Sequence, residues 1–311
     1  MKKYCFGVDV GGTSVKLGLF DTVGELLEKW EIPTRVENNG EAILPDITKS
    51  IQEKIQEKKL DLNEIEGIGI GAPGPITDDG FLNKTANLGW NTKFNLEEAL
   101  ANLTKMRVKA ANDANVAAFG EMWKGGGEGY SNLVMVTLGT GVGGGVIING
   151  NIVTGVTGSG GEIGHLHVND KEEDVCGCGL HGCLEQYASA TGVVRLANRK
   201  LKDSQEPSML RDTNVSAKTV FDAVKSGDAL AIEIAEEFGC YLGTALSNIA
   251  AVIDTEVFVI GGGVSRAGDV LLEYIQKYYN KNAFFAIRDK KFVLATLGND
   301  AGIYGAARLL L

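Results

Sequence analysis

The chain has 311 residues, more than a single hydrophobic core usually holds, so two domains are expected. Its 44% hydrophobic and 23% charged residues are typical of a soluble globular protein. A net charge of -10 argues against nucleic acid or an anionic membrane as a partner. The apolar run after Lys2 and Lys3 is interrupted by Asp9, so no signal peptide is predicted and the cytoplasm is the expected compartment.

Two hairpins with glycine turns are predicted, one near the start of each half of the chain. Residues 4–9 are apolar, residues 14–21 alternate apolar and other side chains, and Gly11 and Gly12 lie between them. The second copy consists of strand 133–138, the turn Gly139-Thr140-Gly141 and strand 142–148. We interpret the two copies as a duplicated unit, each half opening with antiparallel strands.

The remaining elements indicate an α/β protein. Helical periodicity is found in residues 41–58, 114–123 and 229–253, and residues 301–311 are predicted to form an amphipathic helix that packs back on the first domain. Short strands at 65–70 and 256–260 run directly into glycines. Because ligands of α/β domains bind at the carboxyl ends of strands, these glycine turns are expected to face one cleft between the halves.

The first glycine turn, Asp9-x-Gly11-Gly12-Thr13, carries the groups of a phosphate site. Backbone N–H groups of such a turn can point at one phosphate, and Asp9 is placed to meet a hydrated Mg²⁺. Alone, the pattern fits a ligand-free hairpin equally well. The second turn, Gly139-Thr140-Gly141, favours a clamp for a polyphosphate, and neither turn matches the Walker A pattern.

Two further strand ends carry groups of interest. Gly261-Gly262-Gly263 would let a base or ribose approach the backbone, although a plain strand-to-helix turn fits nearly as well. Asp113 follows the predicted strand 107–110 and precedes a helix, where it could be the N-cap. It could also be the general base that accepts the proton of a hydroxyl attacking the γ-phosphate of ATP, and both roles can coexist.

A cysteine cluster predicts a metal site. Cys176, Cys178 and Cys183 fall within eight residues. Three thiolates and one imidazole satisfy a tetrahedral structural Zn²⁺. A disulfide is the alternative, but the odd local count and the absence of a secretory leader favour a metal.

The fourth ligand of this site is open between three histidines. His165 closes a larger loop than His181, whose position between two cysteines would strain the chelate, and His167 is also near. With any of the three histidines, the metal site would hold Glu162 and Glu185 in place beside the loop. The other two cysteines, Cys5 and Cys240, lie in apolar surroundings and are interpreted as small buried hydrophobes.

With these pieces placed, the chain resembles the ROK family, named for repressors, open reading frames and sugar kinases. The resemblance spans nearly the whole chain and is carried, in the family's order, by Asp9-x-Gly-Gly-Thr13, Gly71-Ala-Pro-Gly74, Asn112-Asp-Ala-Asn115, Gly139-Thr-Gly-x-Gly-Gly144, Gly161-Glu-Ile-Gly-His165, the cysteine triplet and Gly261-Gly-Gly263. Segments 112–123 and 161–192 are most similar to the bacterial glucokinases of the family.

The resemblance implies an α/β actin-like ATPase fold, with two ribonuclease-H-like lobes around a central cleft, often in a homodimer. The N-terminal lobe would comprise residues 1–118, completed by the helix 301–311. The C-terminal lobe would comprise residues 119–300, with the zinc loop at 165–183.

The resemblance also implies roles for individual residues. Asp113 would be the catalytic base. The sugar would be contacted by Gly74, Asn87, Asn112, Asp113, Glu162, His165 and Glu185. ATP and Mg²⁺ would be held by Asp9, Gly11, Gly12, Thr13, Gly139, Thr140, Gly141, Gly262 and Gly263, and a structural Zn²⁺ by His165, Cys176, Cys178 and Cys183. Ala111 stands where many relatives carry Glu, with little expected effect on chemistry.

The function that follows is ATP-dependent phosphorylation of glucose at its 6-hydroxyl. N-acetylmannosamine, fructose or allose are alternative sugars, because those kinases share most sugar contacts. A sugar-responsive repressor of the same family would carry a helix-turn-helix before the core, and Asp9 lies almost at the amino terminus here. A sugar sensor without activity would be expected to lack the base, and Asp113 is present.

Overall fold

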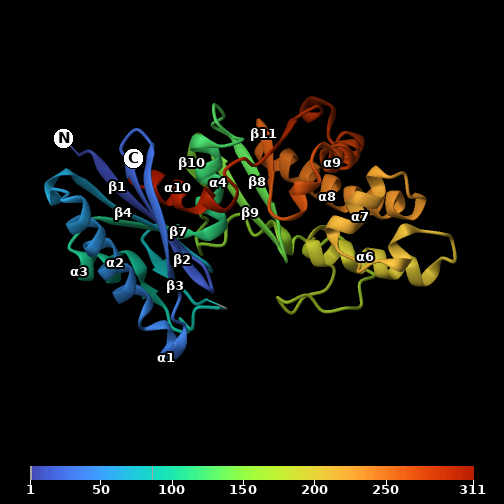
Figure 1. Ribbon diagram of the computed structural model, residues 1–311. Coiled ribbons are helices and arrows are strands. Elements are labelled where there is room, and N and C mark those ends of the chain that lie inside the picture. The colour runs from blue at the N-terminus through green and yellow to red at the C-terminus, as the bar shows by residue number, and fades with distance from the viewer. Residues whose placement is uncertain (1, 86) are drawn as a thin grey trace.

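The computed structural model describes residues 2–85 and 87–311 and contains two five-stranded mixed sheets (Figure 1). The first has the order β3-β2-β1-β4-β7 and the second the order β10-β9-β8-β11-β12. Their strands are β1 (Tyr4–Val10), β2 (Ser14–Asp21), β3 (Leu26–Pro33), β4 (Ile65–Ala72), β7 (Val108–Asn112), β8 (Leu133–Leu138), β9 (Val142–Ile148), β10 (Asn151–Ile152), β11 (Val257–Gly261) and β12 (Lys291–Leu294).

The two sheets have the same topology. In each, three antiparallel strands are followed by two parallel ones, because β1 and β8 pair with a hairpin partner on one side and with a parallel strand on the other. Both predicted hairpins are therefore confirmed, and so is the duplicated unit. A small hairpin of β5 (Phe81–Leu82) and β6 (Phe94–Asn95) stands apart.

Helices cover both faces of each sheet. The helices are α1 (Glu37–Gly40), α2 (Ile43–Lys58), α3 (Leu96–Thr104), α4 (Asp113–Lys124), α5 (Glu185–Ala188), α6 (Ala190–Asp203), α7 (Ala217–Lys225), α8 (Ala229–Ile253), α9 (Asp269–Asn282) and α10 (Ala301–Arg308). The outer face of the first sheet packs on α2 and α3, and that of the second on α6 to α9. In the described part of the chain, no helix combines the length and apolar character needed to cross a bilayer.

The inner faces of the sheets are covered by α4 and α10, which lie between them (Figure 1). Strand alternation explains this arrangement, since Phe6 and Val8 of β1 face the α2 side while Cys5 packs with Ile303 of α10. The predicted helix 301–311 thus packs on β1 and β4, although it ends at Arg308. The predicted lobe boundary after residue 118 falls inside α4 and stays a prediction.

α4 and α10 cross in backbone contact, which glycines make possible. A Cβ on Gly305 would lie 1.6 Å from the carbonyl oxygen of Val116, and one on Gly120 would lie 2.2 Å from that of Ala301. Both distances are far below any real Cβ contact. The two helices therefore join the halves of the molecule at a fixed, close crossing.

We expect Gly305→Ala to lower thermal stability. In an ordinary helix the change would stabilise the protein by about 0.5–1 kcal/mol. Here the added methyl group would force α4 and α10 apart, and overpacking of this kind costs about 1–3 kcal/mol. Thermal denaturation followed by circular dichroism measures the change; a Tm equal to or above that of the parent would contradict the close crossing.

Candidate functional site

Two glycine turns, one from each sheet, are braced by neighbouring segments. Between β1 and β2, the Gly11 N–H donates to the Ser14 carbonyl over 3.0 Å, and the Thr34 hydroxyl donates to the Gly11 carbonyl over 2.7 Å. Between β8 and β9, the Thr140 carbonyl accepts from the Thr191 hydroxyl at the start of α6 over 2.7 Å. Each turn is thus held from outside, and its glycines leave room for a ligand.

Asp9 lies at the end of β1 on the face that meets α10. A Cβ on Gly302 would stand 2.6 Å from Asp9 Oδ2, so this glycine makes space for the carboxylate. Burial raises the pKa of Asp9 to about 6; the charge of Lys16, its cross-strand neighbour, opposes the shift and the charge of Asp113 adds to it. The carboxyls of Asp9 and Asp113 therefore lie close enough to influence one another.

Asp113 is the first residue of α4, and the N-cap is Asn112. The Asn112 Oδ1 accepts from the N–H groups of Ala114 at 2.9 Å and Asn115 at 3.2 Å. The interpretation of Asp113 as N-cap is therefore wrong. Asn112, one position earlier, has the non-helical backbone angles that capping requires, with φ -59° and ψ 147°. Burial raises the pKa of Asp113, although hydrogen bonds from the Ala114 N–H and from Asn112 oppose the shift.

The predicted sugar residues of the first half gather around Asn112. Its Nδ2 donates to the Gly74 carbonyl over 3.1 Å. Gly74 has φ +98°, and a Cβ there would stand 2.5 Å from the Lys84 carbonyl, so the turn requires glycine. Asn87 is exposed, and its Cβ lies 3.6 Å from the place a Cβ on Gly12 would occupy. Asn87 thus adjoins the first glycine turn, and Asn112 holds the turn at Gly74.

The predicted sugar residues of the second half gather around Glu185, which begins α5. A Cβ on Gly141 would stand 2.5 Å from Glu185 Oε2, so this carboxylate adjoins the second glycine turn. Its Oε1 lies 3.0 Å from Cys176 Sγ and 3.9 Å from His165 Nδ1. Glu162 is linked to His165 through its carbonyl, which accepts the His165 N–H over 3.2 Å, and the residue also borders a mainly apolar cavity beside α8.

The two groups meet at the start of α4. This helix begins at the end of β7 in the first sheet and lies on β9 of the second, where Gly145 allows Ala118 to approach and Gly143 faces Ala114. Asp113 therefore stands where the two halves join, between the glycine turn of β1 and that of β8. A carboxylate in this place can accept a proton from a group held by both halves.

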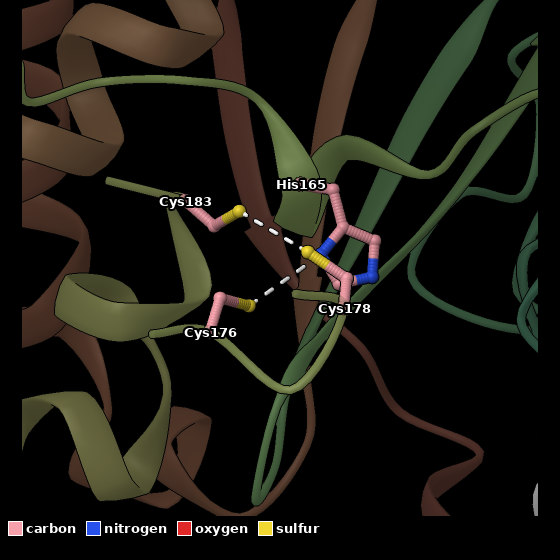
Figure 2. Close-up of side chains that lie close together, drawn as sticks. All are labelled: His165, Cys176, Cys178 and Cys183. Carbon is pink, nitrogen blue, oxygen red and sulfur yellow. Dashed lines mark hydrogen bonds between the residues drawn. The ribbon is translucent and has the colours of Figure 1, made fainter. Parts of the chain in front are cut away.

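The ligand atoms of His165, Cys176, Cys178 and Cys183 all lie within 4.8 Å of one another and point toward one centre (Figure 2). Cys178 Sγ is 3.6 Å from Cys183 Sγ, and Cys176 Sγ is 3.9 Å from His165 Nδ1. Ligands of a tetrahedral zinc ion stand roughly 3.5–3.8 Å apart, given the usual bond lengths. The set therefore fits a tetrahedral metal ion, with His165 rather than His181 or His167 as the imidazole.

His167 and His181 lie outside this cluster, and the His167 ring makes polar contacts elsewhere. The His167 ring contacts the Asp170 carboxylate at 2.7 Å and the His181 carbonyl at 3.0 Å.

The two cysteines outside the cluster differ in exposure. Cys5 is buried as predicted, whereas Cys240 is exposed, because its place in the helical repeat of α8 is turned away from its buried neighbours Gly239 and Leu242.

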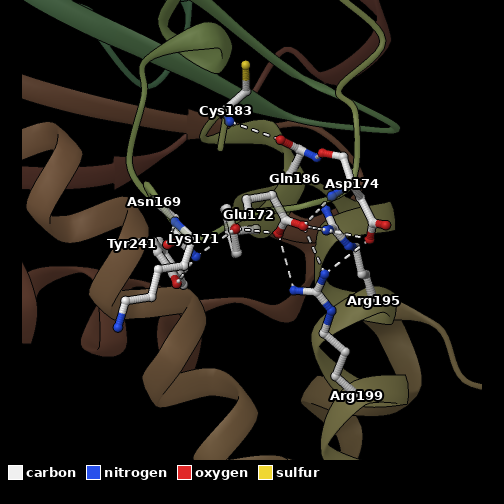
Figure 3. Close-up of polar contacts among 10 residues, drawn as sticks. Asn169, Lys171, Glu172, Asp174, Cys183, Gln186, Arg195, Arg199 and Tyr241 are labelled. Carbon is white, nitrogen blue, oxygen red and sulfur yellow. Dashed lines mark hydrogen bonds and ion pairs between the residues drawn. The ribbon is translucent and has the colours of Figure 1, made fainter. Parts of the chain in front are cut away.

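A buried carboxylate that the sequence analysis missed anchors the metal loop (Figure 3). The side chain of Glu172 is 1% exposed and contacts Arg195 and Arg199 of α6 and the Tyr187 hydroxyl. Burial alone would raise the pKa of Glu172, but hydrogen bonds from Arg199 and Tyr187 and the charge of Arg195 lower it to about 2. The i, i+4 spacing of the two arginines was the only sequence signal of this anchor.

The third glycine segment follows β11 and lies beside the second turn. Gly262 has φ +83°, and a Cβ there would stand 2.5 Å from the Leu138 carbonyl, so β11 ends against the residue before Gly139. Gly263 faces open space and lines a cavity of about 250 Å³. The other walls include Phe221 and Arg266, which sequence reasoning did not identify.

Known proteins resemble this chain over its whole length. The sequence model of the ROK family matches residues 5–311. The glucokinase of Halalkalibacterium halodurans is 43% identical over 99% of this chain and 95% of its own length.

Two solved structures have the same fold. A ROK hexokinase from Thermus thermophilus superposes with a TM-score of 0.82 at 30% identity, covering 98% of this chain and 97% of the other. A ROK family glucokinase from Streptomyces griseus, solved in complex with glucose and AMPPNP, gives a TM-score of 0.74 at 31% identity over 98% of both chains. The α/β fold predicted from the sequence is thereby confirmed as that of the ROK kinases.

We expect Asp9→Asn to raise the Tm of the Mg²⁺-free protein at pH 7.5. The folded pKa of Asp9, about 6, exceeds the roughly 3.9 of an unfolded aspartate. Ionisation of Asp9 therefore lowers the free energy of unfolding, and this loss reaches its full size above about pH 6. The loss disappears on acidification toward pH 4, where the unfolded aspartate is also protonated. The difference in Tm between variant and parent should narrow between pH 7.5 and 5; a variant less stable than the parent at both values would contradict the burial of this charge.

Proposed function

Because the chain belongs to the ROK family and is an ATP-dependent hexose kinase, we propose that it transfers the γ-phosphoryl group of ATP to the 6-hydroxyl of glucose. The observation that carries the proposal is the position of Asp113, half-buried at the start of α4 where the two halves meet. The 43% identity to a glucokinase over nearly the full chain supports glucose as the sugar.

Asp113 is proposed as the general base. Its carboxylate would accept the proton of the 6-hydroxyl as that oxygen attacks the γ-phosphorus and the bond from phosphorus to ADP breaks. Burial raises the pKa of Asp113, which makes the carboxylate a stronger base than an exposed aspartate. The Asn112 cap fixes the first turn of α4 and so the position of this carboxylate.

The sugar would be bound by residues of both halves, namely the backbone of Gly74 and the side chains of Asn87, Asn112, Asp113, Glu162, His165 and Glu185. Vicinal hydroxyls of a hexose each donate and accept, so amides and carboxylates can hold them with charge-assisted hydrogen bonds. Glu185 adjoins the second glycine turn, which would place the sugar next to the transferred phosphate.

ATP would lie across the glycine turns of the two halves. Gly11, Gly12 and Thr13 would hold its phosphates from one side, and Gly139, Thr140 and Gly141 from the other. The cavity beside Gly263 is large enough for the base, and Gly262 brings it next to the second turn. Asp9 would hold Mg²⁺ through its water shell, and this ion would neutralise charge on the phosphates.

A structural Zn²⁺ is proposed for His165, Cys176, Cys178 and Cys183. Three sulfurs and one nitrogen within 4.8 Å of one another, which fill all four positions of a tetrahedral ion, are the donor set of a structural rather than a catalytic zinc. The ion would fix the loop that carries His165 and also Cys183, which stands two residues before Glu185. Metal binding would therefore stabilise the fold and also orient the sugar residues.

A different hexose is the second candidate, since N-acetylmannosamine, fructose or allose would use most of the same contacts. The test is an ADP-coupled assay with Mg-ATP and these sugars beside glucose, mannose and N-acetylglucosamine, compared by kcat/KM. Preference for another sugar would keep the base and reassign the substrate, and no turnover with any sugar would favour a sensor. The homodimer implied by the family resemblance stays a prediction.

Asp113→Asn is expected to lower kcat by a factor of about 10²–10⁴, because general base catalysis contributes that much to such reactions. Glucose binding measured by calorimetry should be nearly unchanged, since the amide can still accept a hydrogen bond from the sugar. Steady-state kinetics with Mg-ATP give kcat. A value within tenfold of the parent would show that another group removes the proton.

Cys178→Ser is expected to release zinc and lower Tm, because one of four metal ligands is lost. Elemental analysis of the purified protein gives the zinc content per chain. His181→Ala is the matched control, since His181 lies in the same loop outside the ligand cluster and its loss should leave the zinc content unchanged. Loss of zinc from the His181 variant with full retention in the Cys178 variant would overturn the ligand set.

A further inference from the structure

A fully buried carboxylate on α4 takes no part in the proposed chemistry. Glu121 is 0% exposed and stands two turns after Asp113 on the same helix. Its Oε2 accepts from the N–H of Gly126 at 2.8 Å and of Thr296 at 3.0 Å, and its Oε1 accepts from the N–H of Leu297 at 2.8 Å. Among the described residues no cation pairs with it, so these three backbone bonds offset its burial.

The segments that Glu121 joins are the two crossings between the halves of the molecule. The chain leaves the first sheet through β7 and α4 to enter the second, and it returns from β12 to α10, which packs on the first sheet. Thr296 and Leu297 belong to the returning segment, and Gly126 follows α4. The Glu121 carboxylate therefore ties the outgoing crossing to the returning one.

The chain is shaped to let this carboxylate reach all three donors. A Cβ on Gly125 would stand 2.0 Å from Glu121 Oε2, and a Cβ on Gly126 would stand 2.3 Å from the Leu294 carbonyl at the end of β12. Side chains at either glycine would displace the loop from the carboxylate or from β12. The three segments are therefore packed closely around the Glu121 carboxylate.

We propose that Glu121 is a positioning residue at the hinge between the two halves, and that its carboxylate sets the angle at which they meet around the reacting groups. Both proposed acidic groups depend on this angle. Asp113 begins the helix that carries Glu121, and Asp9 lies against Gly302 of α10, which follows the segment that Glu121 holds. The inference rests on the kinase activity of the proposed function and is independent of which hexose is used.

An amide cannot replace the carboxylate in this place. Three N–H groups converge on two oxygens, and glutamine would present an NH₂ group to at least one of them. In either orientation of the amide, either the Leu297 N–H or the Thr296 and Gly126 N–H groups would lose their acceptor, so the returning segment would keep only one of its two bonds to α4. Loss of the fixed angle should reduce kcat, since a displacement of about 1 Å of reacting groups can lower rates roughly a hundredfold.

The test compares Glu121→Gln with Glu256→Gln. Glu256 is exposed and lies between α8 and β11, and its Oε2 also accepts backbone N–H groups, from Ser131 at 3.0 Å and Asn132 at 2.8 Å, so these bonds stay within the second half. Both variants should have a lower Tm. Kinetics are measured well below both Tm values, together with small-angle scattering of each protein with and without glucose and Mg-AMPPNP.

We expect Glu121→Gln to lower kcat at least tenfold and to change the radius of gyration of the free protein or its response to ligands. Glu256→Gln should keep the parent's kcat, KM and scattering. If Glu121→Gln lowers Tm but keeps these parent values, the role of Glu121 is only structural and the proposal is overturned.

Two further features keep the test decisive. Glu121→Asp keeps the charge but shortens the side chain by one methylene group, so it should give an intermediate kcat. If the glutamine variant does not fold, the aspartate variant replaces it in the same comparison.

The scattering measurement needs no turnover. A parent that phosphorylates none of the sugars would defeat the proposed function, while scattering with Mg-AMPPNP would still decide the hinge.

Discussion

The backbone contact between α4 and α10 is the constraint on which the site depends. Gly120 and Gly305 let the helices cross where any side chain would collide with a carbonyl group. Each helix lies on the inner face of a different sheet, so the crossing fixes one sheet against the other. Asp113 begins one of these helices and Asp9 lies against the other, and the two acidic groups reach the same place only because the helices touch.

Buried and half-buried carboxylates in this protein are compensated to different degrees, and the difference separates structural from chemical roles. Glu172 faces two arginines, which hold its pKa at about 2, and Glu121 accepts three backbone N–H groups. Asp9 has only the charge of Lys16 to oppose its burial, and its pKa rises to about 6. A carboxylate left this poorly compensated is costly for folding, and such groups concentrate at functional sites, where a cation or substrate completes them.

The sequence predicted what depends on short segments. Strand alternation, glycine turns and the cysteine spacing are local patterns, so both hairpins, helices α2, α4 and α8 and the ligand cluster were found where expected. Glu121 and Glu172 were missed, because their partners lie far along the chain and only the fold brings them together. Asn112 was passed over as the N-cap for a different reason: two adjacent residues can both cap, and the backbone angles decide between them.

The metal loop needs anchors because it has little core of its own. Between residues 165 and 184 the buried apolar groups are confined to Cys176, Cys183 and Leu184. Ordering such a segment loses conformational entropy that apolar burial there cannot offset, so polar contacts and the proposed Zn²⁺ would have to do so. The ligand cluster holds one side of the loop and the Glu172 contacts with α6 hold the other. Glu185 follows directly after the loop, and its carboxylate is therefore placed by both anchors at once.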